Sequence, residues 1–437
     1  MKKEKIAFFW FRRDLRLDDN AGLYHALQSG FPVLPLFIFD KTILDQLENK
    51  EDKRVTFIYQ AISCLKQKLQ KLGSDIEVRY GSPIDIWKEL IQDYDVVEVF
   101  TNHDYEPYAK DRDQEIFDFL KQHNVSFKTY KDQVIFEKQE VLTGQNSVYT
   151  VFTPYSKAWK AKLNDFYLSY YPNEKYFSHF LKIKTQDLLS YKEIGFIETK
   201  TDFPSDEVPS DLIENYQENR NYPAIHGTSH IGIHLRFGTV SIRKVAREAL
   251  EKSDTWLNEL IWRDFYHQIL WNFPHIGQGK AFRLEYDNIR WRNNEKEFEL
   301  WCLGKTGYPL VDAGMHELNE TGFMHNRVRM VTASFLSKHL LIDWRWGEAY
   351  FAEKLLDYDM AANNGGWQWA AGSGTDAAPY FRIFNPTAQA EKFDSKGVYI
   401  KKWVPELNSL DYPAPIVDHK FARERCLKAY KKALNKV

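Results

Sequence analysis

The chain has 437 residues, 43% hydrophobic and 27% charged, which suits a globular protein of roughly two to four domains. No apolar run reaches the ~18 residues of a membrane-spanning helix, and the run ending at residue 11 is too short for a signal peptide. A net charge of −2 excludes a uniformly basic nucleic-acid binder, so any such surface must be local. Three widely spaced cysteines predict a reducing, cytoplasmic (intracellular) location and no metal site.

The first 135 residues alternate between strand-like and helix-like segments. Strands are predicted at 6–11, 33–39, 76–80, 96–101 and 134–136, and helices at 20–29, 53–72, 83–93 and 111–123. This alternation predicts a Rossmann-like, doubly wound parallel sheet with helices on both faces. The turn after the first strand reads FRRDLRLDDN and lacks the GxGxxG fingerprint, so a dinucleotide is not expected to bind there in the usual Rossmann manner.

The remainder divides into a connector and a helical region. Residues 137–205 are irregular and are interpreted as a long linker with some helical content. Beyond them the pattern is mainly helical, with helices predicted at 239–251, 255–272, 295–303, 311–321, 326–339, 346–356 and 421–434. The expected fold class is α/β plus all-α, with divisions 1–136, 137–205 and 206–437.

Two segments combine glycines with polar groups. Residues 227–235 read GTSHIGIHL and predict a helix start whose backbone amides bind an anion, although a plain helix cap would use the same residues. Residues 357–369 read DYDMAANNGGWQW. Their glycines permit close approach of a ligand to the backbone, and their asparagines donate and accept hydrogen bonds, so this segment is predicted to bind a ligand.

The segment NELIWRDFY places Glu259, Trp262 and Arg263 on one face of a helix. A carboxylate and a guanidinium group beside an indole ring suit a pocket in which a planar ligand stacks on that ring. A surface Glu–Arg pair is the alternative.

The segment MHNRVRM places Arg327 and Arg329 on different faces of a helix. One arginine can therefore reach a phosphate while the other forms an inward ion pair; a solvated run of charge is the alternative.

Together these motifs resemble the DNA photolyase/cryptochrome family. The C-terminal signature is carried by MHNRVRM and DYDMAANNGGWQW with TGYPLVDAGMHEL, TASFLSKHLLIDWR and GTDAAPYFRIFNPTAQAEKFD, and the N-terminal signature by WFRRDLRLDDNAGL. The match covers nearly the whole chain. It implies an α/β antenna domain at 1–136, an interdomain linker at 137–205, and a helical FAD- and DNA-binding catalytic domain at 206–437.

The resemblance implies one non-covalent FAD per chain, active in its reduced anionic form. The family's flavin contacts fall on Tyr216, Thr228, Ser229, His230, Ile231, Gly232, Trp256, Glu259, Arg263, Asn326, Arg329, Asp357, Asp359 and Asn363. Asn363 would face flavin N5. The family's electron-relay tryptophans fall on Trp367 nearest the flavin, then Trp344, then Trp291 at the surface.

The resemblance also implies that the partner is UV-damaged DNA containing cyclobutane pyrimidine dimers, bound by a monomer. The family's lesion contacts fall on Glu259, Trp262, Asn326, Met330 and Trp369, and its phosphate contacts on Arg220, Arg327 and Arg382.

The implied reaction is light-driven splitting of the dimer by an electron from reduced FAD, after the lesion has left the duplex as in other base-flipping enzymes such as photolyases. Glu259 would hydrogen-bond a pyrimidine carbonyl as negative charge arrives. To donate that bond, Glu259 needs a pKa well above its ordinary value of about 4.3.

Motif variants indicate the subgroup. Enzymes for (6-4) products have histidines at the places of Asn326 and Met330, and the DASH subgroup has Gln at the second place, whereas HNRVRM resembles class I cyclobutane-dimer photolyases. Asn363, where plant cryptochromes have Asp, argues against a cryptochrome-like photoreceptor, and no extension is expected beyond the last predicted helix. That photoreceptor and a flavoprotein without light chemistry remain the alternatives.

Two departures from the family pattern stand out. The phosphate-binding motif TSxLSP reads TSHIGI, so Gly232 and Ile233 replace Ser and Pro. Gly277 and Gln278 occupy the place of a Cys-Lys pair of folate enzymes, although Glu106 keeps an acid near the antenna region. Folate, deazaflavin, a second flavin and an empty site therefore all stay open for the antenna.

Overall fold

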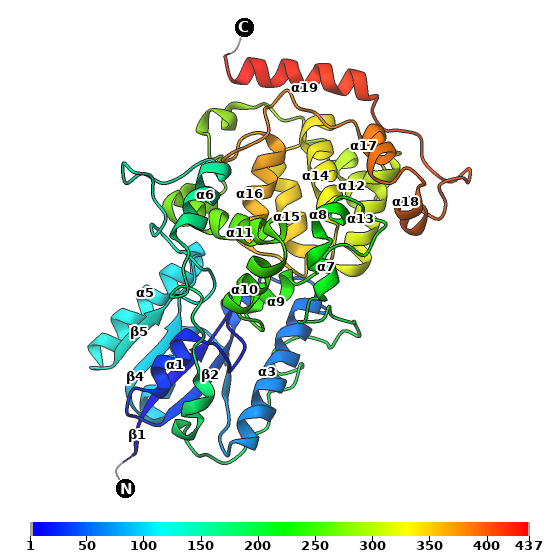
Figure 1. The fold of residues 1–437 in the computed structure, drawn as a ribbon. Coiled ribbons are helices and arrows are strands. Elements are labelled where there is room, and N and C mark those ends of the chain that lie inside the picture. The colour runs from blue at the N-terminus through cyan, green and yellow to red at the C-terminus, as the bar shows by residue number, and fades with distance from the viewer. Residues whose placement is uncertain (1–2, 436–437) are drawn as a thin grey trace. The chain divides into compact units, whose positions relative to one another are not determined.

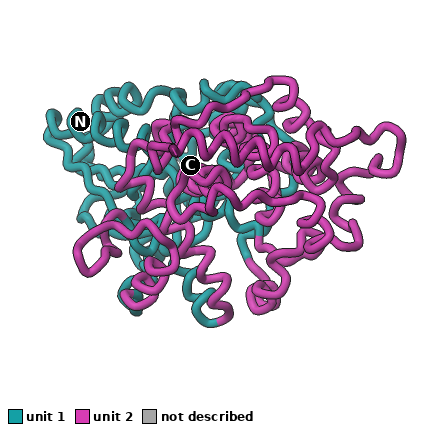
Figure 2. Tube along the Cα trace, turned by 90° about the horizontal axis from the view of Figure 1, so that it is seen from above, with its two compact units in different colours: residues 1–137, 163–207, 230–251 teal, residues 138–162, 208–229, 252–437 magenta. Residues whose placement is uncertain are grey.

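The computed structural model describes residues 3–435, which form two compact units (Figure 2). Unit 1 comprises residues 1–137, 163–207 and 230–251, and unit 2 comprises residues 138–162, 208–229 and 252–437. The predicted linker is thus shared: 138–162 belong to unit 2 and the residues from 163 onward to unit 1. The functional division at 136 and 205 remains a prediction.

Unit 1 is built on a five-stranded parallel sheet with strand order β3-β2-β1-β4-β5. In the central strand, Phe8 pairs with Leu34 of one neighbour and with Val99 of the other. Its elements are β1 (Lys5–Phe11), α1 (Ala21–Leu27), β2 (Val33–Asp40), α2 (Lys41–Leu44), α3 (Lys53–Lys71), β3 (Glu77–Gly81), α4 (Pro83–Asp93), β4 (Asp95–Asn102), α5 (Pro107–Gln122), β5 (Ser126–Tyr130), η1 (Asn173–His179), α9 (Gly232–Phe237) and α10 (Ile242–Lys252).

Both faces of this sheet are covered, as expected for strands that are nearly continuous apolar runs. Phe8 and Trp10 of β1 pack with Trp87 of α4 and Ile116 of α5 in one buried cluster. On the other face, Phe39 of β2 stacks near Tyr59 of α3, and α1 lies against β1 and β4 (Figure 1). The predicted doubly wound parallel sheet is confirmed.

The predicted strand at 134–136 is wrong. The fifth strand is β5 (Ser126–Tyr130), and Val134, Ile135 and Phe136 lie buried in the irregular segment that follows it. A three-residue apolar run has no measurable period, so its burial in a loop cannot be told from burial in a strand.

Unit 2 is helical (Figure 1). Its elements are α6 (Phe152–Lys162), α7 (Ser210–Glu214), α8 (Tyr216–Asn219), α11 (Asp254–Asn272), η2 (Pro274–Gln278), η3 (Leu284–Asn288), α12 (Glu295–Cys302), α13 (Pro309–Thr321), α14 (Asn326–Ser334), η4 (Phe335–His339), α15 (Trp344–Lys354), α16 (Met360–Ala371), α17 (Pro386–Phe393), α18 (Val398–Trp403) and α19 (His419–Ala433). The segment η4 is a π-helical continuation of α14. The predicted helical C-terminal part is confirmed.

Side-chain caps fix where the central helices of unit 2 begin. Ser253 accepts from the Trp256 amide at the start of α11, His325 accepts from the Arg327 amide at the start of α14, and Asp359 accepts from the Ala362 amide at the start of α16. Within residues 3–435, none of the helices is long and apolar enough to cross a membrane.

Candidate active site

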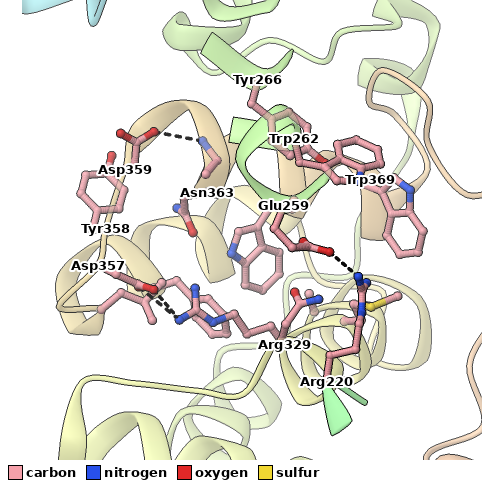
Figure 3. A pocket seen from close by; sticks show the side chains of 18 residues that line it. Arg220, Glu259, Trp262, Tyr266, Arg329, Asp357, Tyr358, Asp359, Asn363 and Trp369 are labelled. Atoms are coloured by element: carbon pink, nitrogen blue, oxygen red, sulfur yellow. Dashed lines mark hydrogen bonds and ion pairs between the residues drawn. The ribbon is translucent and has the colours of Figure 1, made fainter. Parts of the chain in front are cut away.

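Unit 2 contains a cavity of about 360 Å³ between α11, α14, α15 and α16 (Figure 3). In Figure 3, Trp262, Tyr266 and Trp369 gather on one side and the Arg329–Asp357 pair lies on the other. The lining residues are Arg220, Glu259, Trp262, Tyr266, Asn326, Arg329, Met330, Ala333, Phe351, Leu355, Asp357, Tyr358, Asp359, Ala362, Asn363, Gly366, Trp367 and Trp369.

Helix α11 contributes three side chains to the cavity. Glu259, Trp262 and Tyr266 lie at positions i, i+3 and i+7, so they share one face. The predicted pairing of Glu259 with Trp262 in one pocket is therefore observed. Arg263 and Trp256 lie on the same helix but are not among the lining residues, and Trp256 is buried in the core.

Trp262 is held in a stack that the sequence did not reveal. The ring of Phe152, at the start of α6, lies parallel to it, with centroids 3.7 Å apart and planes 3° apart. Tyr266 contacts the same indole at 5.4 Å. The ring of Trp262 is thus fixed before any ligand binds.

Helix α14 presents the face formed by Asn326, Arg329, Met330 and Ala333, which are spaced i, i+3, i+4 and i+7. Arg329 donates to both carboxylate oxygens of Asp357, at 3.1 and 3.0 Å. Arg329 therefore forms the inward ion pair predicted from the HNRVRM motif.

Helix α16 brings its backbone close to the cavity through two glycines that differ in environment. A Cβ on Gly365 would lie 2.2 Å from the Tyr266 ring, whereas a Cβ on Gly366 would meet nothing within 4 Å. Gly365 lets α16 pack against α11, and Gly366 leaves free space at the cavity wall. Asn363 lines the same wall, and its Nδ2 donates to the backbone oxygen of Glu348 at 3.1 Å.

Glu259 is ion-paired with Arg220 in this structure. Its side chain is 31% exposed. Burial raises the pKa of Glu259 above its ordinary value, and the nearby Arg220 guanidinium opposes this shift. The direction agrees with the requirement for a protonated acid at this position, although the ion pair favours the charged form while Arg220 stays in place.

The arginines predicted to contact phosphate lie near one another. Arg220 lines the cavity, while Arg327 donates to Asn221 Oδ1 at 2.6 Å and lies 4.3 Å from the Phe393 ring. Burial lowers the pKa of Arg327, and the charges of Arg220 and Arg382 lower it further. The three guanidinium groups are therefore near enough for their charges to interact, and their binding of phosphate remains a prediction.

Other predicted cofactor residues lie outside the lining of this cavity. Tyr216 contacts the Arg220 guanidinium at 5.4 Å, and Thr228 and Ser229 lie in irregular backbone of unit 2. His230, Ile231 and Gly232 belong to unit 1.

The predicted capping role of Thr228 and Ser229 is wrong. Helix α9 begins at Gly232 with Ile231 as its N-cap, and no side chain caps it. His230 has φ 52°, a left-handed conformation that a right-handed helix cannot include. The helix therefore starts later than the Gly-Thr-Ser pattern suggests.

Of the predicted relay tryptophans, Trp367 lines the cavity and is 2% exposed. Trp344 is buried in the same hydrophobic cluster, and Trp291 is partly buried and packs against it. The structure thus places all three in one aromatic core, with their order in a relay still a prediction.

The family profile described as DNA photolyase matches residues 7–173, and the profile described as FAD binding domain of DNA photolyase matches residues 256–411. The deoxyribodipyrimidine photo-lyase of Escherichia coli is 38% identical over 97% of this chain and 98% of its own length.

Two solved structures are also similar. A bacterial class III photolyase from Agrobacterium tumefaciens is 32% identical, with a TM-score of 0.88 over 100% of this chain and 99% of that one. A cryptochrome from Synechocystis sp. PCC6803 is 26% identical, with a TM-score of 0.85 over 98% of this chain and 100% of that one.

This chain therefore belongs to the DNA photolyase family, as the motifs indicated. It carries the FAD-binding domain of that family, in the part of the chain that forms the cavity, and it is an enzyme of the photo-lyase class.

Proposed function

We propose that this chain repairs cyclobutane pyrimidine dimers in DNA under blue light, as a monomer with one non-covalent FAD bound in the unit 2 cavity. The observation that carries the proposal is the composition of that cavity. It brings together the Asn363 amide, the partly buried indoles of Trp262 and Trp369, the half-buried acid Glu259 and the nearby Arg220. At the places where repair of (6-4) products uses imidazoles, the cavity has Asn326 and Met330.

The residues present fit a flavin. Gly366, Ala362 and Ala333 lack bulk and leave room for a planar ring system, and Asn363 and Asp359 supply polar groups along its edge. Arg329 and Asp357 would hold the end of the ligand opposite the aromatic side chains. When bound in its reduced anionic form, FAD supplies the light-driven electron that splits the cyclobutane ring. This assignment uses residues of unit 2; contacts from Tyr216, Thr228, Ser229, His230, Ile231, Gly232, Trp256 and Arg263 remain predictions.

The protein's task is to receive and polarise the lesion. Trp262 and Trp369 would stack against the two flipped pyrimidines. Arg220, Arg327 and Arg382 would bind DNA phosphates, and the departure of Arg220 from Glu259 would remove the charge that favours the ionised acid. Since burial already raises the pKa of Glu259, the freed carboxyl group would hold a proton and donate it in a hydrogen bond to a pyrimidine carbonyl.

The choice of lesion follows from proton chemistry. A (6-4) product requires transfer of a hydroxyl or amino group between its bases, and an imidazole with a pKa near 6.5 suits that step. The amide of Asn326 is not a practical acid and the thioether of Met330 carries no proton. Splitting a cyclobutane dimer needs only an electron, which reduced FAD would supply, and a hydrogen-bond donor to a pyrimidine carbonyl. Glu259 would be that donor.

The test is to irradiate reduced holoenzyme with oligonucleotides that carry each lesion, and to separate the products by chromatography. We expect dimer repair in light but not in darkness, and no change in (6-4) products. Glu259→Ala should lower the number of dimers split per absorbed photon while FAD remains bound. Efficient (6-4) repair, or no dimer repair by properly reduced protein, would overturn the proposal.

A light-signalling role without repair is the second candidate, because a cryptochrome is among the similar structures. Repair of dimer-bearing DNA by the purified protein separates the two functions, since a photoreceptor of this kind would bind FAD and absorb blue light but leave the dimer intact.

An antenna chromophore in unit 1 is a further proposal, with folate, deazaflavin and flavin as candidates. The carboxyl ends of parallel strands, where such ligands bind, carry Glu106 beside Arg13 and Arg236, which pair with it at 3.0 and 2.6 Å. Because both arginines already occupy this carboxylate, Glu106 does not select among the three pigments. Pigment extraction from the purified protein decides the question.

A further inference from the structure

The turn that follows α16 makes two hydrogen bonds to the segment that enters α6. The hydroxyl of Thr375 donates to the backbone oxygen of Thr150 at 2.6 Å, and the backbone N–H of Phe152 donates to Oδ2 of Asp376 at 3.2 Å. The Phe152 N–H is one of the first amides of α6, which have no acceptor within their own helix. A carboxylate at this position also stabilises the positive end of the helix dipole. Asp376 therefore caps α6 from a position 224 residues away in the sequence.

This turn is itself packed closely against the end of α16. The Gly374 N–H donates to the backbone oxygen of Gln368 at 3.0 Å, and a Cβ on Gly374 would lie 2.9 Å from the carbonyl carbon of Gln368. Thr375 is 3% exposed. Asp376 has φ 45°, a left-handed conformation in which Asp and Asn are enriched. Local packing thus holds the Thr375 and Asp376 side chains in place.

The two hydrogen bonds connect the parts of unit 2 that carry the two cavity indoles. Trp369 belongs to α16, just before the turn. Trp262 belongs to α11, and Phe152 lies parallel to its ring with centroids 3.7 Å apart. Because Phe152 covers one face of Trp262, a ligand can stack only on the other face. The turn therefore links the helix of Trp369 to the ring that orients Trp262.

The rest of α6 is anchored to α11 by other bonds. Ser156 and Trp159 donate to side chains of α11 at 3.0 and 2.9 Å. These residues lie about one and two helical turns beyond Phe152. A change at Asp376 should therefore act on the first turn of α6 and leave the helix docked.

We propose that Asp376 is a positioning residue for lesion binding, which fixes Phe152 and through it the ring of Trp262. Thr375 holds the same segment by its bond to the preceding backbone. With both bonds in place, Trp262 and Trp369 keep the relative placement that a linked pair of pyrimidines requires. This inference rests on the proposed stacking of the dimer against these two indoles.

The consequence is a preference for damaged DNA. An indole that is already held in place loses less conformational freedom when a base stacks on it. Undamaged DNA places no flipped dimer on Trp262, so its affinity does not depend on this ring. Asp376 should therefore affect the ratio of affinities for damaged and undamaged DNA.

The experiment compares Asp376→Asn with Asp376→Gly. Both remove the same charge and both tolerate left-handed backbone, but only Asn keeps an oxygen that can accept from the Phe152 N–H. Fluorescence anisotropy with holoenzyme measures affinity for matched duplexes with and without a dimer. We expect Asp376→Gly to lower the preference for damaged DNA by about 2- to 10-fold, as for the loss of one hydrogen bond. Asp376→Asn should keep the wild-type preference.

A double-mutant cycle with Phe152→Ala tests whether Asp376 acts through that ring. In the Phe152→Ala background, Asp376→Gly should not lower the preference further, because the ring that it holds is gone. Thr375→Val keeps the shape of the side chain and removes the hydroxyl donor. It should lower the preference in the same direction.

Bound FAD per chain and thermal unfolding show whether each variant is folded. If Asp376→Gly loses FAD, Thr375→Val takes its place in the cycle. Additive effects in the cycle, an unchanged preference in the folded single variant, or an equal loss in Asp376→Asn and Asp376→Gly would overturn the positioning role. Failure of the wild-type protein to prefer and repair dimer-bearing DNA would instead refute the proposed function.

Discussion

Glu348 is a half-buried acid beside the candidate site, and its removal from water raises its pKa to about 7 from an ordinary value of 4.5. Asn364 Nδ2 donates to its carboxyl group at 2.8 Å. Because the folded protein holds this proton to higher pH than the unfolded chain does, the contribution is fully present below the unfolded pKa. It is lost as pH rises through about 7, and by linkage the loss amounts to at most about 3 kcal/mol.

We therefore expect Glu348→Gln to remove a pH dependence of stability. The variant should gain up to about 3 kcal/mol relative to wild type between about pH 5 and pH 8, because the amide keeps an acceptor for Asn364 but cannot ionise. Urea unfolding at several pH values measures this difference. Glu424→Gln, on the exposed side of α19, serves as the control. Parallel stability curves for wild type and Glu348→Gln would contradict the prediction.

Phe152 gives a second prediction for a single residue. Its parallel stack on Trp262 holds the indole in place before a lesion arrives. Phe152→Ala should weaken binding of dimer-containing DNA by roughly 3- to 10-fold, the loss of one aromatic contact of about 0.5–1.5 kcal/mol. Fluorescence anisotropy with matched damaged and undamaged duplexes measures this, with exposed Val151→Ala as control. An equal loss on undamaged DNA would point to a general defect instead.

At the scale of elements, the packing of α16 against α11 depends on Gly365, whereas the next residue, Gly366, faces the cavity. Gly365→Ala would drive a methyl group into the Tyr266 ring, 2.2 Å away, and should destabilise the protein by about 1–3 kcal/mol. Gly366→Ala meets no atom within 4 Å and should leave stability equal or higher by up to about 1 kcal/mol. It should nevertheless lower FAD affinity by filling ligand space.

The two variants are each other's control. Thermal unfolding of the apo forms reports the packing effect, and FAD titration followed by flavin fluorescence reports the cavity effect. Stability changes of equal size would show that the two glycines are not divided in this way.

The sequence predicted the strands and helices whose apolar pattern was long enough to show a period. Four of the five predicted strands are present, and helices α11, α13 and α19 begin and end close to their predicted bounds. The three-residue run at 134–136 was too short for that, and the true last strand, Ser126–Tyr130, is half polar. Local pattern could not decide between them because the packing partners lie elsewhere in the chain.

The site shows the same limit. Tyr266 could have been predicted, because it continues the face of Glu259 and Trp262 by one helical turn. Phe152 could not, since only tertiary packing brings it against Trp262 across more than a hundred residues. The Gly-Thr-Ser helix start failed for a local reason, the left-handed backbone of His230, which no capping rule anticipates.

At the scale of the whole molecule, a net charge of −2 means that affinity for DNA must come from a few local cations. Arg220, Arg327 and Arg382 are near enough for their charges to lower the pKa of Arg327. The Nε of Arg327 is buried without a hydrogen-bond partner among the described residues. A bound phosphate would relieve the repulsion among the three and could accept from Arg327.

Arg327→Ala and Arg382→Ala should each weaken binding of dimer-containing DNA and flatten its dependence on salt. Each phosphate contact releases condensed counterions, so losing one should reduce the slope of log affinity against log salt by about 1. Anisotropy titrations over a range of salt concentrations give the slopes directly. Arg423→Ala removes an equal charge from the exposed side of α19 and should leave the slope unchanged, which separates local contact from net charge. If both Arg327→Ala and Arg382→Ala keep the wild-type slope, or if Arg423→Ala flattens it equally, the phosphate-binding surface lies elsewhere on the molecule.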